Sequence, residues 1–83
     1  MSMDVLLHEV LRKIHSGMMS FKSDSRSLDD INRFQSFAKA IVHAQSLGYI
    51  EQMIPHKEHY SGNGHYDLIL VRGGLTHEGV LKL

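Results

Sequence analysis

The sequence contains no cysteine and no tryptophan, only one proline, and no excess of either charge. Without cysteine, disulfide cross-links and thiolate zinc sites are excluded, and we expect a reducing, cytoplasmic location. Nine Lys and Arg residues balance nine Asp and Glu residues, so the basic excess typical of nucleic-acid binders is missing. No apolar run approaches the roughly 18 residues of a membrane span, and the N-terminus lacks a signal-peptide pattern.

What the sequence does have is the composition of one small globular domain. Its 83 residues are 42% hydrophobic and 22% charged, which is ordinary for a globular protein. A chain of this length buries about 60–65% of the surface that its unfolded form exposes, so its core is small. We therefore expect a single domain over residues 1–83.

The first predicted element is a helix over residues 4–15. An apolar stripe recurs along it at helical spacing, and Gly17 follows as a stop signal. The stripe consists of Met3, Leu7, Val10, Leu11 and Ile14. Residues 18–22 then predict a brief strand or an extended linker, and residues 23–27 a polar loop.

Residues 28–47 predict helical structure because they contain neither glycine nor proline. Ser27 with Asp30 predicts a capped start, and the glycine at the far end predicts the stop. Three apolar residues lie off the stripe that the others form: Leu28, Val42 and Leu47. This misfit favours two helices at an angle, over 28–35 and 37–47, although one unbroken helix stays open.

The second half of the sequence predicts a β-hairpin. Residues 49–54 form the first strand, which Pro55 should stop, and residues 65–71 form the second. The polar segment between them ends in Gly-Asn-Gly, a turn signal. We expect the Gly-Gly pair at 73–74 to end the second strand, and Thr76 to cap a last helical turn.

This order of elements resembles a winged helix, an α+β fold with three helices and a small antiparallel sheet. Two segments make the resemblance specific: Leu-Gly-Tyr-Ile at residues 47–50, and Leu-Thr-His-Glu-Gly at residues 75–79, followed by Leu81. Both are similar to segments of small bacterial and phage winged-helix proteins of the YjcQ type. Most of those families have no assigned function, so the resemblance implies a winged helix-turn-helix rather than an activity.

The sequence shows no catalytic or cofactor motif. His8 begins a zinc-protease pattern, but Arg12 stands where the second metal ligand is needed. His56, His59 and His65 around the hairpin could gather three imidazoles for zinc, yet no clear fourth ligand accompanies them. A polar, histidine-rich loop explains them as well. We therefore expect no enzyme activity, no cofactor and no metal.

Binding to double-stranded DNA is the function that the winged-helix pattern favours, as in a small transcriptional regulator. The outward face of the proposed third helix would then enter the major groove. It would present Ser36, Lys39, Ala40, His43 and Ser46. We expect Arg33 to contact the backbone from the preceding helix, and His56, Lys57 and His59 to contact DNA from the wing. The alternative is a winged helix that mediates protein interaction or dimerisation and binds no nucleic acid.

A homodimer is predicted from the second strand of the hairpin. Residues 68–71 read Leu-Ile-Leu-Val, although alternate side chains of a strand face opposite sides of the sheet. Both faces are therefore apolar, and something must cover the face away from the helices. We assign Ile69 and Val71 to an interface with a second copy. The short C-terminal turn is the other candidate for this cover.

Overall fold

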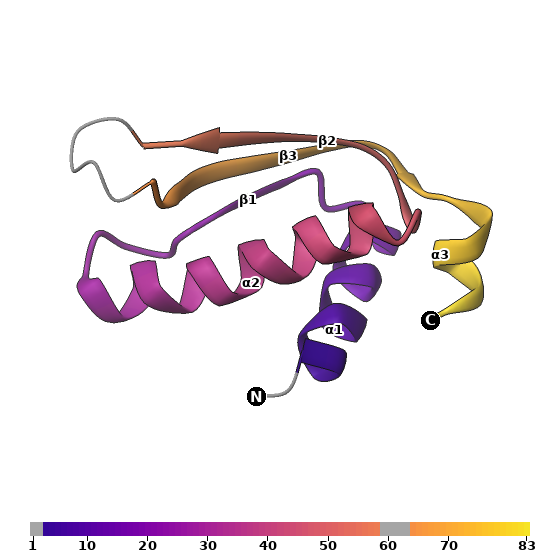
Figure 1. The fold of residues 1–83 in the computed structure, drawn as a ribbon, viewed down its shortest axis with the longest axis horizontal. Helices are drawn as coiled ribbons and strands as arrows, with labels where there is room; N and C mark the ends of the chain where they lie inside the picture. The colour runs from indigo at the N-terminus through magenta and orange to yellow at the C-terminus, as the bar shows by residue number, and fades with distance from the viewer. Residues whose placement is uncertain (1–2, 59–63) are drawn as a thin grey trace.

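The computed structural model describes residues 3–58 and 64–83, and within them the chain forms three helices and three strands (Figure 1). In chain order these are α1 (Met3–His15), β1 (Ser20–Lys22), α2 (Leu28–Ser46), β2 (Ile50–Lys57), β3 (Tyr66–Leu75) and α3 (His77–Leu81). The α+β class expected from the sequence is confirmed, as is the first helix, and of the two alternatives for residues 18–22 the structure has the brief strand.

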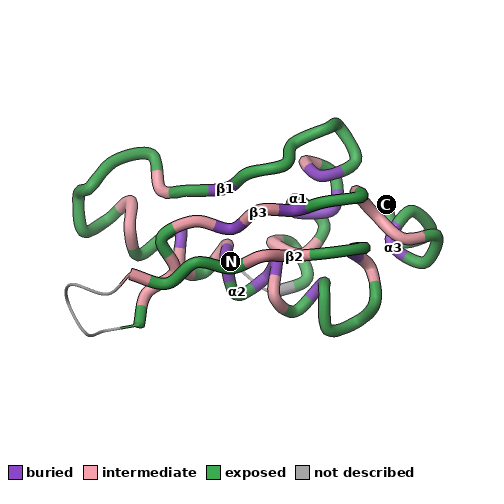
Figure 2. Tube along the Cα trace, turned by 90° about the horizontal axis from the view of Figure 1, so that it is seen from above, coloured by how far each residue is buried: buried purple, intermediate pink, exposed green. Residues whose placement is uncertain are grey.

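The three strands form one antiparallel sheet in the order β1-β3-β2. The longest strand, β3, therefore lies in the middle, with β1 and β2 at the edges (Figure 2). Helices α1 and α2 pack against one face of this sheet, and α3 lies beyond its end (Figure 1). The fold thus has two layers, and its core lies between them.

The core consists of apolar side chains from both helices and all three strands. Phe21 of β1 and Ile69 of β3 are partners across the sheet, and Ile69 is completely buried beneath the helices. The buried set is Val10, Leu11, Ile14, Phe21, Phe34, Ala38, Ala40, Ile41, Ala44, Ile50, Ile69 and Val71. The apolar stripe predicted for the first helix supplies three of these residues, so its inward face is confirmed.

The break that the sequence favoured within residues 28–47 is wrong, because α2 is one continuous helix. Ser27 caps its start by accepting a hydrogen bond from the Asp30 backbone N–H, as predicted. The misfitting residues do not bend the helix: Leu28 and Leu47 are 70% and 45% exposed, and Val42 is half-buried. Without glycine or proline inside, the helix tolerates these apolar residues on its surface rather than kinking.

Both strands of the hairpin extend further than predicted. β2 continues through Pro55, which pairs with Ile69. Proline is tolerated here because β2 is an edge strand, so the proline nitrogen, which has no hydrogen to donate, can lie on the open side of the sheet. β3 continues through Gly73 and Gly74, whose φ angles are +78° and +69°. The register shifts beside them, so this pair forms an irregularity within the ladder instead of ending it.

The C-terminal helix is held against the junction between α2 and β2. Thr76 caps α3 by accepting from the Gly79 N–H, and its own hydroxyl donates to the Gly48 carbonyl oxygen at 2.5 Å. On α1, His8 Nε2 lies 2.7 Å from the Lys82 carbonyl oxygen, which joins the first helix to the end of the third. Within residues 3–58 and 64–83, no helix has the length and apolarity that crossing a membrane requires.

Candidate functional site

The solvent-exposed side of α2 is the first candidate site. Four of the residues predicted there are exposed: Ser36, Lys39, His43 and Ser46. At about 100° per residue they share one side of the helix, together with exposed Asn32. We call these five residues the α2 solvent face. Asn32 was missed because the predicted break assigned it to a different helix from the other four.

Two residues predicted for DNA contact lie elsewhere. Ala40 is completely buried, because it belongs to the side of α2 that packs in the core, so its assignment to an outward face is wrong. Arg33 is exposed, but it precedes Lys39 by six residues, which turns it about 120° away around the helix axis. It lines a pocket between α2, β1 and α1 instead.

The hairpin residues predicted for the wing diverge as well. His56 pairs with Leu68 and Lys57 with Tyr66, and a register shift separates these two pairs. The Lys57 Nζ atom lies 5.2 Å from the centroid of the Tyr66 ring, and that ring packs against the core. Because His56 and Lys57 are adjacent in a strand, they face opposite sides of the sheet. His59 lies outside the described residues.

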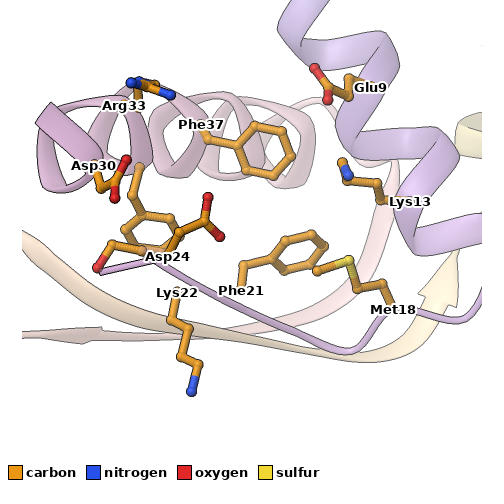
Figure 3. Close-up of a pocket in the computed structure, with 11 residues that line it drawn as sticks. Glu9, Lys13, Met18, Phe21, Lys22, Asp24, Asp30, Arg33 and Phe37 are labelled. Atoms are coloured by element: carbon orange, nitrogen blue, oxygen red, sulfur yellow. The ribbon is translucent and has the colours of Figure 1, made fainter. Parts of the chain in front are cut away.

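A pocket of about 290 Å³ lies where α1, β1 and the N-terminal half of α2 meet (Figure 3). Phe21, Phe34, Phe37 and Met18 form its apolar lining, with 5.7 Å between the ring centroids of Phe21 and Phe37. The rim carries charges of both signs, from Glu9, Lys13, Asp24, Asp30 and Arg33. The pocket can accept an apolar group, but its mixed rim selects no particular charge on a ligand.

The sequence did not predict this pocket, because β1 was expected to be either a strand or a linker. β1 supplies one wall of the pocket through Phe21, and the pairing of Phe21 with Ile69 holds this wall in place. In Figure 3 the Phe21 ring points toward α2, whereas Lys22, the next residue, points away from the pocket. All three phenylalanines of the chain line this pocket, but Phe21 lies far from Phe34 and Phe37 in the sequence, so no local pattern indicated that they meet.

The loop before α2 is ordered by hydroxyl groups around one carboxylate. The Ser25 hydroxyl donates to the Asp30 carboxylate at 2.6 Å, and the Ser27 N–H donates to the Ser25 hydroxyl at 3.1 Å. The hydrogen bond from Ser25 is the main cause that holds the pKa of Asp30 below its ordinary value of 3.8, with further contributions from Ser27 and the charge of Arg33. Burial opposes them.

No group of three or more His, Asp or Glu side chains in residues 3–58 and 64–83 is arranged to hold a metal ion. His56 and His65 flank the hairpin loop, and the third imidazole of the zinc alternative, His59, lies outside the described residues.

The residues assigned to a dimer interface lie in the core. Ile69 and Val71 are 0% and 1% exposed and face the helices, so they cannot contact a second copy, and that assignment is wrong. The pair that turns away from the helices is Leu68 and Leu70, which are half-buried. α3 packs near α1 and the α2–β2 junction, so it does not cover this pair.

Comparison of the chain with known protein families, curated proteins and solved structures found no match. The resemblance to winged-helix proteins of the YjcQ type therefore stays a prediction. Because no relative suggests a role, the function must be inferred from the geometry and chemistry of the chain itself.

Proposed function

We propose that this protein is a winged-helix-like module that binds double-stranded DNA through the α2 solvent face and acts as a small transcriptional regulator. The order helix, strand, helix and hairpin, with an antiparallel β1-β3-β2 sheet, supports this architecture. In place of a helix-turn-helix, the binding element is the continuous helix α2. Fold alone does not specify binding, so the proposal depends on the chemistry of that helix.

The observation that carries the proposal is the absence of carboxylates from the centre and C-terminal part of α2. No Asp or Glu occurs between Ile31 and Ile50, although the chain has nine acidic residues in total. From Ser36 to Ser46 the α2 solvent face therefore offers Lys39, His43 and small hydrogen-bonding side chains with no acidic residue of α2 among them, whereas Asp29 lies one turn before Asn32 at its N-terminal end. A helix about 10–12 Å across fits a major groove about 12 Å wide.

Lys39 is central to this interaction because it is the only Lys or Arg on the α2 solvent face. Its ammonium group can pair with a phosphate or with the acceptor atoms of guanine, whereas Asn32 and Ser36 can hydrogen-bond to base edges. With so few cations and a net charge of zero, few phosphates are neutralised. We therefore expect modest affinity and a shallow dependence on salt.

The test is a titration of labelled duplex DNA, followed by fluorescence anisotropy at several salt concentrations. Replacing Lys39 with alanine should weaken binding and lower the slope of log K against log salt by about one unit. Lys82→Ala is the matched control, because it removes the same charge from the residue that follows α3 and should leave the slope unchanged. Arg33→Ala should likewise leave the salt slope unchanged, because Arg33 does not lie on the α2 solvent face. Equal slopes for Lys39→Ala and the wild type would reject the proposal.

A second candidate is a protein-interaction module that binds no nucleic acid, including a homodimer. Zero net charge and the half-buried Leu68 and Leu70 on the uncovered side of the sheet favour it. Sedimentation at tens of micromolar separates the two cases. A dimer whose formation is abolished by Leu70→Lys, together with no DNA binding at low salt, would establish the second candidate over the first.

A further inference from the structure

The face of the sheet opposite α1 and α2 is not covered by any described part of the chain (Figure 1). Phe21, Ile69 and Val71 are buried toward the helices, so their neighbours in each strand point to the other side. Figure 2 views the molecule from this side, with the three strands lying next to one another. We call this side the open sheet face.

Cross-strand pairing places an apolar centre on the open sheet face. Leu70 pairs with Ile54 of β2, and Leu68 lies two positions before Leu70 on β3. All three are half-buried, and none belongs to the hydrophobic core cluster or to the side chains packed against it. The face therefore has apolar groups that the monomer leaves partly in water.

Basic side chains surround this centre. Lys22 and His56 pair with Leu68 from its two sides, and Arg72 follows Leu70 at the next outward position of β3. All three basic residues are exposed. The two strand carboxylates, Glu51 and Asp67, lie at the register shifts near the two ends of β2 and β3. Asp67 and Glu58 line a pocket beside β1 together with Lys22, whereas Arg72 is not among the residues that line it. No carboxylate is among the residues that regular alternation places on the open sheet face.

We propose that the open sheet face binds an acidic amphipathic helix of a partner protein. Three strands span about 10 Å between the outer two, which matches the width of one helix. Leucine-type side chains of the partner would pack on Leu68, Leu70 and Ile54, while its carboxylates pair with Lys22 and Arg72. The partner helix would add a third layer, on the side of the sheet that α1 and α2 leave uncovered (Figure 1).

The edges of the sheet favour a helix over an added strand. β2 carries Pro55, which has no N–H to donate, and β1 has only three residues. An extra strand would therefore find few regular hydrogen-bond partners on either side. Binding on the face needs no backbone pairing, so these features do not impede it.

A second copy of the chain fits the open sheet face less well than an acidic helix does. Two sheets packed face to face lie about 10 Å apart, which would bring the basic residues of both copies near one another. A stable interface buries about 800 Å² per partner, or roughly one seventh of the 5551 Å² surface of this chain. Three half-buried apolar side chains supply little of this area, so we expect a second copy to bind only transiently.

The experiment uses two synthetic helical peptides that share a leucine face. Glutamates flank this face in one peptide and lysines in the other, and ¹H–¹⁵N spectra of the full-length protein follow each titration. The glutamate peptide should shift signals of Leu68, Leu70 and Ile54, with at least about tenfold higher affinity than the lysine peptide. The double variant Lys22→Glu, Arg72→Glu should reverse this preference.

Lys39→Glu is the matched control, since it reverses one charge on the α2 solvent face and should keep the preference for the glutamate peptide. Equal affinity for both peptides, or shifts confined to α2 or to the pocket of Figure 3, would overturn the proposal. Concentration-dependent shifts of the same signals without peptide would assign the face to a second copy instead. Because DNA binding depends on Lys39 and peptide binding on Lys22 and Arg72, the two proposals fail separately.

Discussion

The side-chain amide of Gln35 on α2 makes two hydrogen bonds to the backbone of Tyr66 at the start of β3. The amide oxygen accepts from the Tyr66 N–H at 2.7 Å, and the amide nitrogen donates to the Tyr66 carbonyl oxygen at 2.9 Å. β1 ends at Lys22, opposite Leu68, so Tyr66 lies beyond the last pair that β1 provides. Gln35 takes the place of a strand neighbour there and ties the helix layer to the sheet.

We expect Gln35→Ala to lower the free energy of unfolding by about 1–3 kcal/mol, because both backbone groups of Tyr66 lose their partner in a partly buried place. Gln45→Ala is the control, since Gln45 is exposed on the same helix and the substitution makes the same chemical change. Urea unfolding followed by circular dichroism measures both. If the two variants were equally stable, the Gln35–Tyr66 contact would contribute nothing.

Ile69 and Leu70 are neighbours on β3, yet we expect opposite results when each is replaced with lysine. Ile69 is completely buried under the helices, so Ile69→Lys places a charge in the core and should prevent cooperative folding of a domain whose total stability is only about 4–12 kcal/mol. Leu70 lies on the open sheet face, so Leu70→Lys should cost about 1 kcal/mol or less. Thermal unfolding compares them. If the Ile69→Lys variant folded cooperatively, the register that turns Ile69 toward the helices would be wrong.

Much of the fold followed from local patterns, because periodicity and capping residues act over a few positions. The stripe over residues 4–15 and the Ser27 cap were sufficient to predict α1 and the start of α2. The break in α2 was a wrong inference, because it assumed that apolar Leu28 and Leu47 must be buried. A short chain buries only part of its surface, and both residues are exposed.

The candidate sites were harder to predict, since they depend on contacts between distant residues. Alternation showed that either Leu68 and Leu70 or Ile69 and Val71 face outward, but only the packing of the helices decides which pair does. Pairing of Phe21 with Ile69 completes the pocket, and no local pattern indicates that partner. The Gln35–Tyr66 contact joins residues 31 positions apart, so no local pattern indicates it either.

The surroundings of Gly79 explain why the segment Leu-Thr-His-Glu-Gly ends in glycine. A Cβ atom at this position would overlap the Tyr49 carbonyl oxygen, to which the Thr76 N–H donates at 3.0 Å. Alanine normally favours a helix over glycine by about 1 kcal/mol, but here we expect Gly79→Ala to destabilise the protein by at least about 1 kcal/mol. Glu78→Ala, at an exposed position of α3, is the control and should be nearly neutral. A stabilised Gly79→Ala variant would contradict the close approach of α3 to Tyr49.

The last prediction concerns acid stability and the carboxylate of Asp30. Its pKa is lowered below 3.8 in the folded protein, chiefly by the hydrogen bond from Ser25, so folding favours the charged form. The resulting stabilisation is present above the ordinary value of 3.8 and is lost as the pH falls through the lower pKa of the folded state. Removing the Ser25 hydroxyl should therefore raise the pKa of Asp30 toward 3.8 and weaken this dependence on pH.

NMR titration of the Asp30 carboxyl carbon, together with unfolding measured across the acidic range, tests this directly. Ser25→Ala should move the Asp30 midpoint upward. The control is Ser23→Ala, because the Ser23 hydroxyl donates to the backbone oxygen of Ser25 at 2.9 Å rather than to the carboxylate. An upward shift in Ser25→Ala alone would show that this hydroxyl stabilises the charged carboxylate at the start of α2. Identical midpoints in the wild type and Ser25→Ala would mean that the loop hydroxyl does not hold Asp30 in solution.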